Sequence, residues 1–179
     1  MNTRPLLVAQ PTHRKQPNMS TIQKISTCLW FDGQAEQAAA FYTSIFKGSK
    51  ILRTARYGDA GPGPKDSVMT VEFELGDRHF LALNAGPQFK FTEAISLQVY
   101  CDTQGEIDEL WTKLTAGGGE GGPCGWLKDP FGLSWQVTPT MLPNMMVDPD
   151  PARTNRVMQA MMQMKKLDIA RLEQAFRNP

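Results

Sequence analysis

The sequence repeats itself once at an offset of 70 residues, and this repeat limits the possible folds more than any other feature. The segment 25–48, ISTCLWFDGQAEQAAAFYTSIFKG, lies over the segment 95–118, ISLQVYCDTQGEIDELWTKLTAGG, without a gap. Asp32 meets Asp102 in this superposition. A repeated unit of this size is much longer than a solenoid repeat, so we expect two duplicated modules.

Each copy begins with a β-rich run that ends at an aspartate and continues with a helical pattern. In the first copy Ala38, Tyr42 and Ile45 recur at helical spacing, and Ile107 and Leu114 do so in the second. Glycines follow both patterns and are typical helix ends. We therefore predict a β-α-β-β-β order in both modules, with strands at 25–31, 51–57, 67–75, 79–83, 95–101, 119–121, 125–128 and 134–138.

The predicted fold class is α+β, with two tandem βαβββ modules that form a curved, cup-like mixed sheet and a C-terminal helical tail. The 179 residues are enough to bury a core without disulfides or metal ions. We expect a disordered leader at 1–21, a folded domain at 22–139 and a helical tail at 140–179. Within the domain the modules span 22–88 and 93–139.

Methionine is concentrated in the tail, where seven of the ten residues of this type lie at position 141 or later. Asp150 followed by Pro151 is a typical helix start, and Asp168 is suited to cap a second short helix. Methionine-rich stripes are adaptable contact surfaces. The stripe either covers the chain's own domain or contacts a second copy, and we expect a homodimer. Its residues are Val157, Met158, Met161 and Met162.

The charges exclude some classes of partner. The net charge is +1, but residues 19–150 sum to −6 and residues 151–179 to +4. An acidic body is a poor binder of phosphate backbones, so we expect no nucleic-acid partner. No apolar run is long enough to cross a membrane. Three cysteines, an odd number without a CxxC pair, favour a reducing compartment, and we expect a cytoplasmic protein.

Four segments carry a resemblance to a known family. They are LWFDGQAEQAAAFYTSIF (29–46), FLALNAGPQFKF (80–91), CGWLKDPFGLSWQVTP (124–139) and RVMQAMMQMKKLDIARLEQAF (156–176). Together with the duplicated βαβββ unit, they resemble the PhnB-like branch of the glyoxalase/bleomycin resistance/dioxygenase (vicinal oxygen chelate) superfamily. That branch is often labelled 3-demethylubiquinone-9 3-methyltransferase. The resemblance spans about residues 22–177 and implies strands that curve into an open, ligand-binding cup.

The resemblance also implies where a metal ion would bind in the metal-dependent members of the superfamily. The matching positions are Ser26, Ser96, Gln136 and a fourth near Ala82. A catalytic divalent ion needs imidazole, carboxylate or thiolate ligands, and these side chains are neutral. Of the two histidines, His13 falls in the leader and His79 begins a strand. We therefore expect no metal site and no cofactor.

Period-two alternation indicates which side chains share the face of the cup. If Ser26 points inward, so do Cys28 and Trp30, and Gln136 brings Ser134 with it. Such side chains either fill the interior or line a site for a small, partly apolar ligand that carries a carbonyl, amide or carboxylate group. The candidate ligand-binding residues are Cys28, Trp30, Asn84, Gln98, Tyr100, Cys124, Trp126, Lys128 and Gln136.

No catalytic residue can be identified from the sequence. A reactive Cys28 or Cys124 would need a neighbouring base, and only Lys128 is a candidate. The glycine cluster 117–122 follows a helix, whereas a nucleotide-binding loop follows a strand. We predict a metal-free cup protein that binds a small organic ligand. The alternatives are an enzyme, either the methyltransferase of the family label or a lyase or isomerase, and a drug-sequestering protein of the resistance type.

Overall fold

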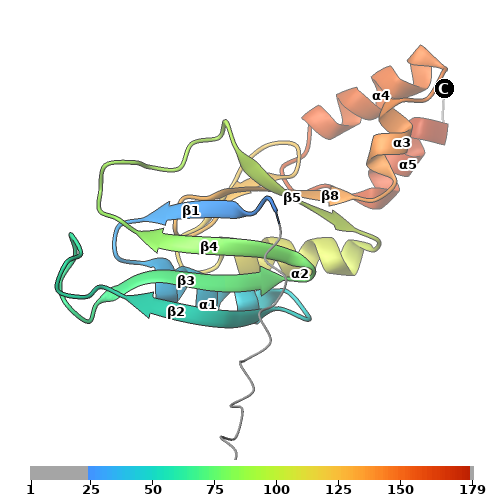
Figure 1. Cartoon of the computed structure of the whole chain (residues 1–179). Helices are drawn as coiled ribbons and strands as arrows, with labels where there is room; N and C mark the ends of the chain where they lie inside the picture. Colours follow the sequence, from blue (N-terminus) through green and yellow to red (C-terminus); the bar gives the residue numbers. More distant parts are fainter. Residues whose placement is uncertain (1–23, 178–179) are drawn as a thin grey trace, which may run out of the picture.

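The computed structural model describes residues 24–177, and the predicted leader at 1–21 lies outside them. Two βαβββ modules are followed by three helices, which confirms the predicted fold class (Figure 1). The first module comprises β1 (Thr27–Phe31), α1 (Ala35–Ile45), β2 (Lys50–Arg56), β3 (Val68–Leu75) and β4 (Arg78–Asn84). The second comprises β5 (Ser96–Cys101), α2 (Gln104–Thr115), β6 (Glu120–Gly121), β7 (Trp126–Lys128) and β8 (Ser134–Pro139). The tail contains α3 (Leu142–Met146), α4 (Pro151–Met162) and α5 (Ile169–Arg177).

Each module forms its own four-stranded mixed sheet. The strand orders are β1-β4-β3-β2 and β5-β8-β7-β6, so the first and last strands of each module lie side by side. These two pairs are parallel, and the other pairs are antiparallel. No ladder of backbone hydrogen bonds joins the two sheets within residues 24–177, so the single curved sheet that we expected is in fact two sheets.

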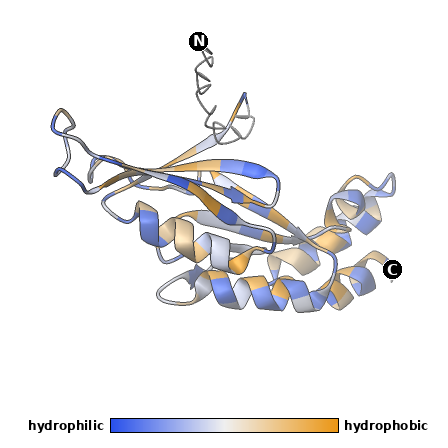
Figure 2. Ribbon diagram, turned by 60° about the horizontal axis from the view of Figure 1, so that its bottom comes forward, coloured by the Kyte–Doolittle hydropathy of each residue, from blue (hydrophilic) through white to orange (hydrophobic). Residues whose placement is uncertain are grey.

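The helices cover one side of the strands (Figure 2). One apolar core contains residues of both modules, because aromatic side chains of α1 reach the second sheet. Tyr42 is fully buried, and its ring lies 5.6 Å from that of Trp135. Phe46 stacks on the same indole at 5.3 Å. The modules are therefore joined through the layer between α1 and β8 rather than through strand pairing.

The tail has an apolar cluster of its own, formed by buried side chains such as Val157 and Leu172. It also contacts the second module of the same chain, away from the first module (Figure 1). The side chain of Gln104 donates to the Leu167 carbonyl and accepts from the Ile169 amide, at 3.1 and 2.9 Å. The predicted caps are confirmed, since Asp150 and Asp168 each accept a hydrogen bond from the first turn that follows them.

Gly125 marks the place where the tail approaches the second module. Its φ angle is +84°, and a side-chain carbon there would lie 2.8 Å from the Val137 carbonyl oxygen and 3.0 Å from Leu167. Its amide donates to the Lys165 carbonyl at 2.7 Å. Glycine is therefore required by both backbone geometry and space. Within the described part of the chain, no helix has the length and apolar character needed to cross a membrane.

Candidate ligand-binding face

The second sheet presents a polar face on the side opposite its helix. Leu127, Trp135 and Val137 point into the core and are at most 2% exposed. Because side chains alternate along a strand, their neighbours point the other way. Strand register then aligns these neighbours in rows across the sheet. We call this surface the polar face; its residues are Glu120, Lys128, Ser134 and Ser96 in one row, Trp126, Gln136 and Gln98 in the next, and Thr138 and Tyr100 in the third.

Five of the nine predicted binding residues lie together on the polar face. Gln136 donates to the Ser96 hydroxyl at 2.9 Å, which ties β8 to β5. The Tyr100 hydroxyl donates to the side-chain oxygen of Gln98 at 3.0 Å, and both side chains are exposed. The face therefore offers amide and phenol groups to a ligand. The five residues are Gln98, Tyr100, Trp126, Lys128 and Gln136.

An ion pair borders the polar face. The ammonium group of Lys128 lies 2.5 Å from a carboxylate oxygen of Glu93, in the segment that connects the two modules. This hydrogen bond lowers the pKa of Glu93 and raises the pKa of Lys128, and the charge of Glu120 adds to the increase for Lys128. A depression of about 390 Å³ lies beside the pair. It is lined by Glu93, Glu120, Gly121, Gly122, Pro123, Trp126, Leu127, Lys128 and Ser134.

Cys28 and Trp30 lie on the first sheet, on the side opposite the buried Leu29 and Phe31. The Trp30 indole donates to the Gly86 carbonyl at 2.8 Å. A hollow of about 330 Å³ is lined by both Trp30 and Lys128, so the two sheets approach each other at this end. Cys28 is exposed and forms no disulfide.

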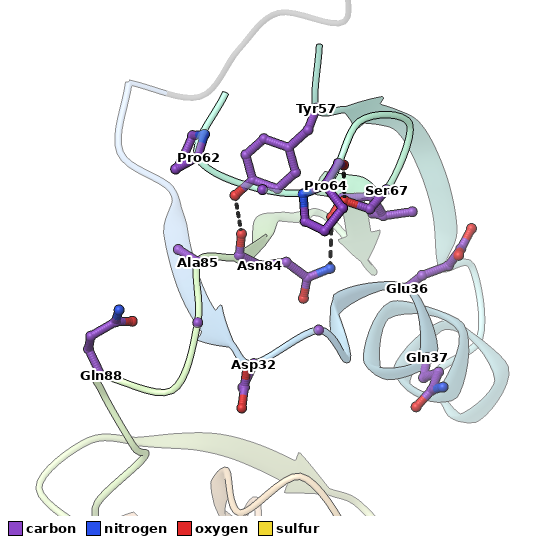
Figure 3. Close-up of a pocket in the computed structure, with 14 residues that line it drawn as sticks. Asp32, Glu36, Gln37, Tyr57, Pro62, Pro64, Ser67, Asn84, Ala85 and Gln88 are labelled. Atoms are coloured by element: carbon purple, nitrogen blue, oxygen red, sulfur yellow. Dashed lines mark hydrogen bonds between the residues drawn. The ribbon is translucent and has the colours of Figure 1, made fainter. Parts of the chain in front are cut away.

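Asn84 lies on the opposite side of the first sheet, facing α1. The side-chain oxygen of Asn84 accepts a hydrogen bond from the Ala35 backbone amide at 2.9 Å. Its side-chain nitrogen donates to the Val68 backbone carbonyl at 3.0 Å. Figure 3 shows Asn84 in a separate pocket of about 630 Å³, where Tyr57 donates to the Asn84 backbone carbonyl. Asn84 therefore does not share an open face with the other predicted residues.

Cys124 is not part of a strand. It lies in the turn before β7 with a φ angle of +56°, and its amide donates to the Met164 carbonyl at 2.8 Å. Its sulfur lies 3.7 Å from that of Met162. We expected Cys124 among the ligand-binding residues, but it does not share a strand face with Trp126 and Lys128, because β7 begins only at Trp126.

The residues at the superfamily's metal positions do not fit a divalent ion. Ser26 precedes β1, and Ala82 is fully buried in the core beneath the sheet. Ser96 and Gln136 are neutral and bonded to each other. Among residues 24–177, no three His, Cys, Asp or Glu side chains are grouped as metal ligands. The nitrogen Nε2 of His79 instead lies 2.7 Å from Glu74 on the first sheet.

Sequence reasoning missed the neighbours that define the site. Glu93 lies in a connecting segment without periodicity, so no pattern placed it beside Lys128. Glu120 belongs to a two-residue strand, which is too short for the sequence to predict its register. Alternation from Gln136 predicts the face on which Ser134 lies, but it does not predict that Ser134 is buried. In each case the answer depends on contacts between distant segments, which local sequence patterns do not specify.

The chain matches a known protein family over most of its two modules. Residues 23–138, well over half of the chain, match the family described as 3-demethylubiquinone-9 3-methyltransferase. The chain belongs to this family. It is the PhnB-like family within the glyoxalase/bleomycin resistance/vicinal oxygen chelate fold. The match ends before the tail, so the resemblance of 156–176 to the family stays a prediction.

Solved structures agree with this assignment. A PhnB protein from Bacillus cereus, described as a candidate 3-demethylubiquinone-9 3-methyltransferase, is 38% identical with a TM-score of 0.59, over 66% of this chain and 100% of that one. Protein PA1353 from Pseudomonas aeruginosa shares the fold at 22% identity and a TM-score of 0.54, over 65% and 97%. A comparison with curated proteins finds no match.

The family description names a methyltransferase, which would need a site for a methyl donor. The glycine cluster 117–122 does not have the arrangement of a loop that binds such a nucleotide donor. Gly117 and Gly118 have φ angles of +74° and +114° and follow α2 directly. The cluster then enters β6, so it lies between a helix and a strand in the order opposite to that of a nucleotide-binding loop. We derive no methyl-transfer step from these residues.

Proposed function

We propose that this PhnB-like protein binds a small, partly apolar organic ligand on the polar face, without a metal ion. The observation that carries the proposal is the hydrogen bond between Gln136 and Ser96. Two positions that hold an ion in metal-dependent members of the superfamily are here neutral groups that bond each other. They leave an amide and a hydroxyl at the surface where those members carry a charged metal centre.

The face suits such a ligand chemically. Ligand sites combine apolar or aromatic walls with a few oriented polar groups. Trp126 and Tyr100 supply aromatic surface, and Gln98 and Gln136 supply both donors and acceptors. Tyr100 is 52% exposed, so its ring is open to a ligand or to a second chain.

We further propose that the protein acts as a homodimer in the cytoplasm. Met158 and Met162 on α4 are 39% and 61% exposed, although the adjacent Val157 is buried, so α4 presents apolar surface that a second chain could cover. The three free cysteines are consistent with a reducing compartment.

A fragment screen by NMR tests the ligand proposal. Protein treated with a chelator would be screened against a set of aromatic amides, alcohols and carboxylates, with backbone amide shifts as the readout. We expect hits that shift Gln98, Tyr100 and Gln136, and weaker binding in Gln136→Ala. Thr112→Ala, an exposed change on α2, serves as the control. The proposal fails if no fragment shifts the polar face, or if binding requires an added metal ion.

A further inference from the structure

One polar atom on the polar face has no partner. The hydroxyl oxygen of Ser134 is buried and forms no hydrogen bond, and the residue is only 1% exposed. It is the one buried side-chain nitrogen or oxygen of the described residues left in this state. A buried hydroxyl without a partner destabilises the fold, so such groups are rare unless a ligand completes them.

The Ser134 side chain is directed toward the depression beside Lys128. Its neighbours Leu133 and Trp135 point into the core, so alternation places Ser134 on the polar face. Strand register puts it directly opposite Lys128, and it lines the 390 Å³ depression. Trp126 supplies a half-buried aromatic wall in the same depression.

The charges around the depression disfavour an anionic ligand. The charge of Lys128 is compensated by Glu93 at 2.5 Å, and Glu120 lies opposite Lys128 in the strand register. These three side chains sum to −1. An anion therefore meets a surplus of negative charge, whereas a neutral ligand does not.

We infer that this depression is a subsite for a neutral aromatic ring that carries one carbonyl or hydroxyl group. The ring lies against Trp126, and the polar group forms the hydrogen bond that Ser134 lacks. This inference rests on the proposed function and names the ligand class and the place on the polar face where it binds. The backbones of Gly121 and Gly122 line the same depression.

Three probes with the same ring test the charge and the position together. Benzamide, benzoate and benzylamine are neutral, anionic and cationic at pH 7. Amide shift titrations should show benzamide binding with changes at Trp126, Ser134 and Gly122. Benzoate should bind markedly more weakly because it is anionic, and benzylamine because it has no oxygen to pair with Ser134. Glu120→Gln should raise the affinity for benzoate about threefold, since it removes one negative charge at the rim.

Ser134→Ala gives the most specific readout. Removal of an unpaired buried hydroxyl should raise Tm by about 2–4 °C and weaken benzamide binding about fivefold. Trp126→Leu should weaken benzamide binding further. Ser44→Ala, which changes an exposed hydroxyl already bonded within α1, should alter neither quantity.

The outcomes separate this inference from the proposed function. A lower Tm in Ser134→Ala would show that the hydroxyl is already paired, and would overturn the inference. So would benzoate binding more tightly than benzamide, or the absence of binding by all three probes. Fragment hits that shift Gln98 and Gln136 but leave Trp126 and Ser134 unchanged would overturn the subsite while supporting the proposed function.

Discussion

Asp129 illustrates how much of this fold depends on one residue. Its carboxylate accepts hydrogen bonds from the amides of Phe131 and Leu133 in the turn that follows, at 2.9 and 3.0 Å. The structure adds the Tyr42 hydroxyl and the Trp135 indole, both at 2.8 Å. Burial raises the pKa of Asp129, and these four donors counteract the increase. One carboxylate thus joins α1, a turn and β8.

Asp129→Ala should therefore be strongly destabilising. The substitution leaves four donors without an acceptor in a buried place, and we expect the free energy of unfolding to fall by about 3–5 kcal/mol. Urea unfolding monitored by tryptophan fluorescence measures it. Asp59→Ala, which breaks an exposed ion pair with Lys65, should change it by less than about 0.5 kcal/mol. Equal effects in the two variants would contradict this assignment.

Cys28 and Cys101 should differ sharply in reactivity. Cys101 is 1% exposed, and burial together with the charges of Glu106 and Asp102 raises its pKa to about 11. Cys28 is exposed on the first sheet. We expect iodoacetamide at pH 8 to modify Cys28 in the native protein and Cys101 only after unfolding, with peptide mass spectrometry as the measurement. Rapid native modification of Cys101 would contradict the burial of β5.

At the scale of elements, the sequence predicted the types and order of strands and helices better than their contacts. Local signals identified all eight strands and α1, α2, α4 and α5. These signals were β-rich runs, helical spacing and, for α4 and α5, the capping residues Asp150 and Asp168. The boundary of β7 was wrong because the Cys124 turn adopts a positive φ angle that no pattern indicates. The short helix α3 was not predicted.

The same limit applies to the candidate site. Five of its residues could be placed on one face by alternation alone. The orientation of Asn84 and Ala82 could not, because the choice between the two faces of β4 depends on where α1 packs. Glu93 comes from the connecting segment, and its contact with Lys128 depends on how the chain crosses between modules.

Gln104 should control how firmly the tail is held. Its side chain bonds the Leu167 carbonyl and the Ile169 amide, which form the entry to α5. Gln104→Ala removes both bonds, and we expect faster hydrogen exchange in α5, equivalent to about 1–2 kcal/mol less protection, with little change in β8. Gln159→Ala on the exposed side of α4 is the control. Unchanged exchange in α5 would show that the apolar cluster alone holds the tail.

At the scale of the whole molecule, the two sheets have the duplicated architecture of the superfamily, and the positions that the resemblance matches to metal ligands carry neutral side chains. The modules share one core through Tyr42 and Trp135, so their open faces are held in a fixed relation. At two of these positions a serine hydroxyl and a glutamine amide are bonded at 2.9 Å. The account therefore predicts recognition by neutral hydrogen bonds and aromatic contact.

Elemental analysis of the purified protein tests this central claim most directly. The protein would be produced in medium supplemented with zinc, nickel, manganese and iron, purified without chelators or an affinity tag that binds metal, and analysed by mass spectrometry of the elements. We predict far less than one ion of any of these metals per chain, and no change in Gln136→Ala. A stoichiometric ion that is lost in Gln136→Ala would contradict the account.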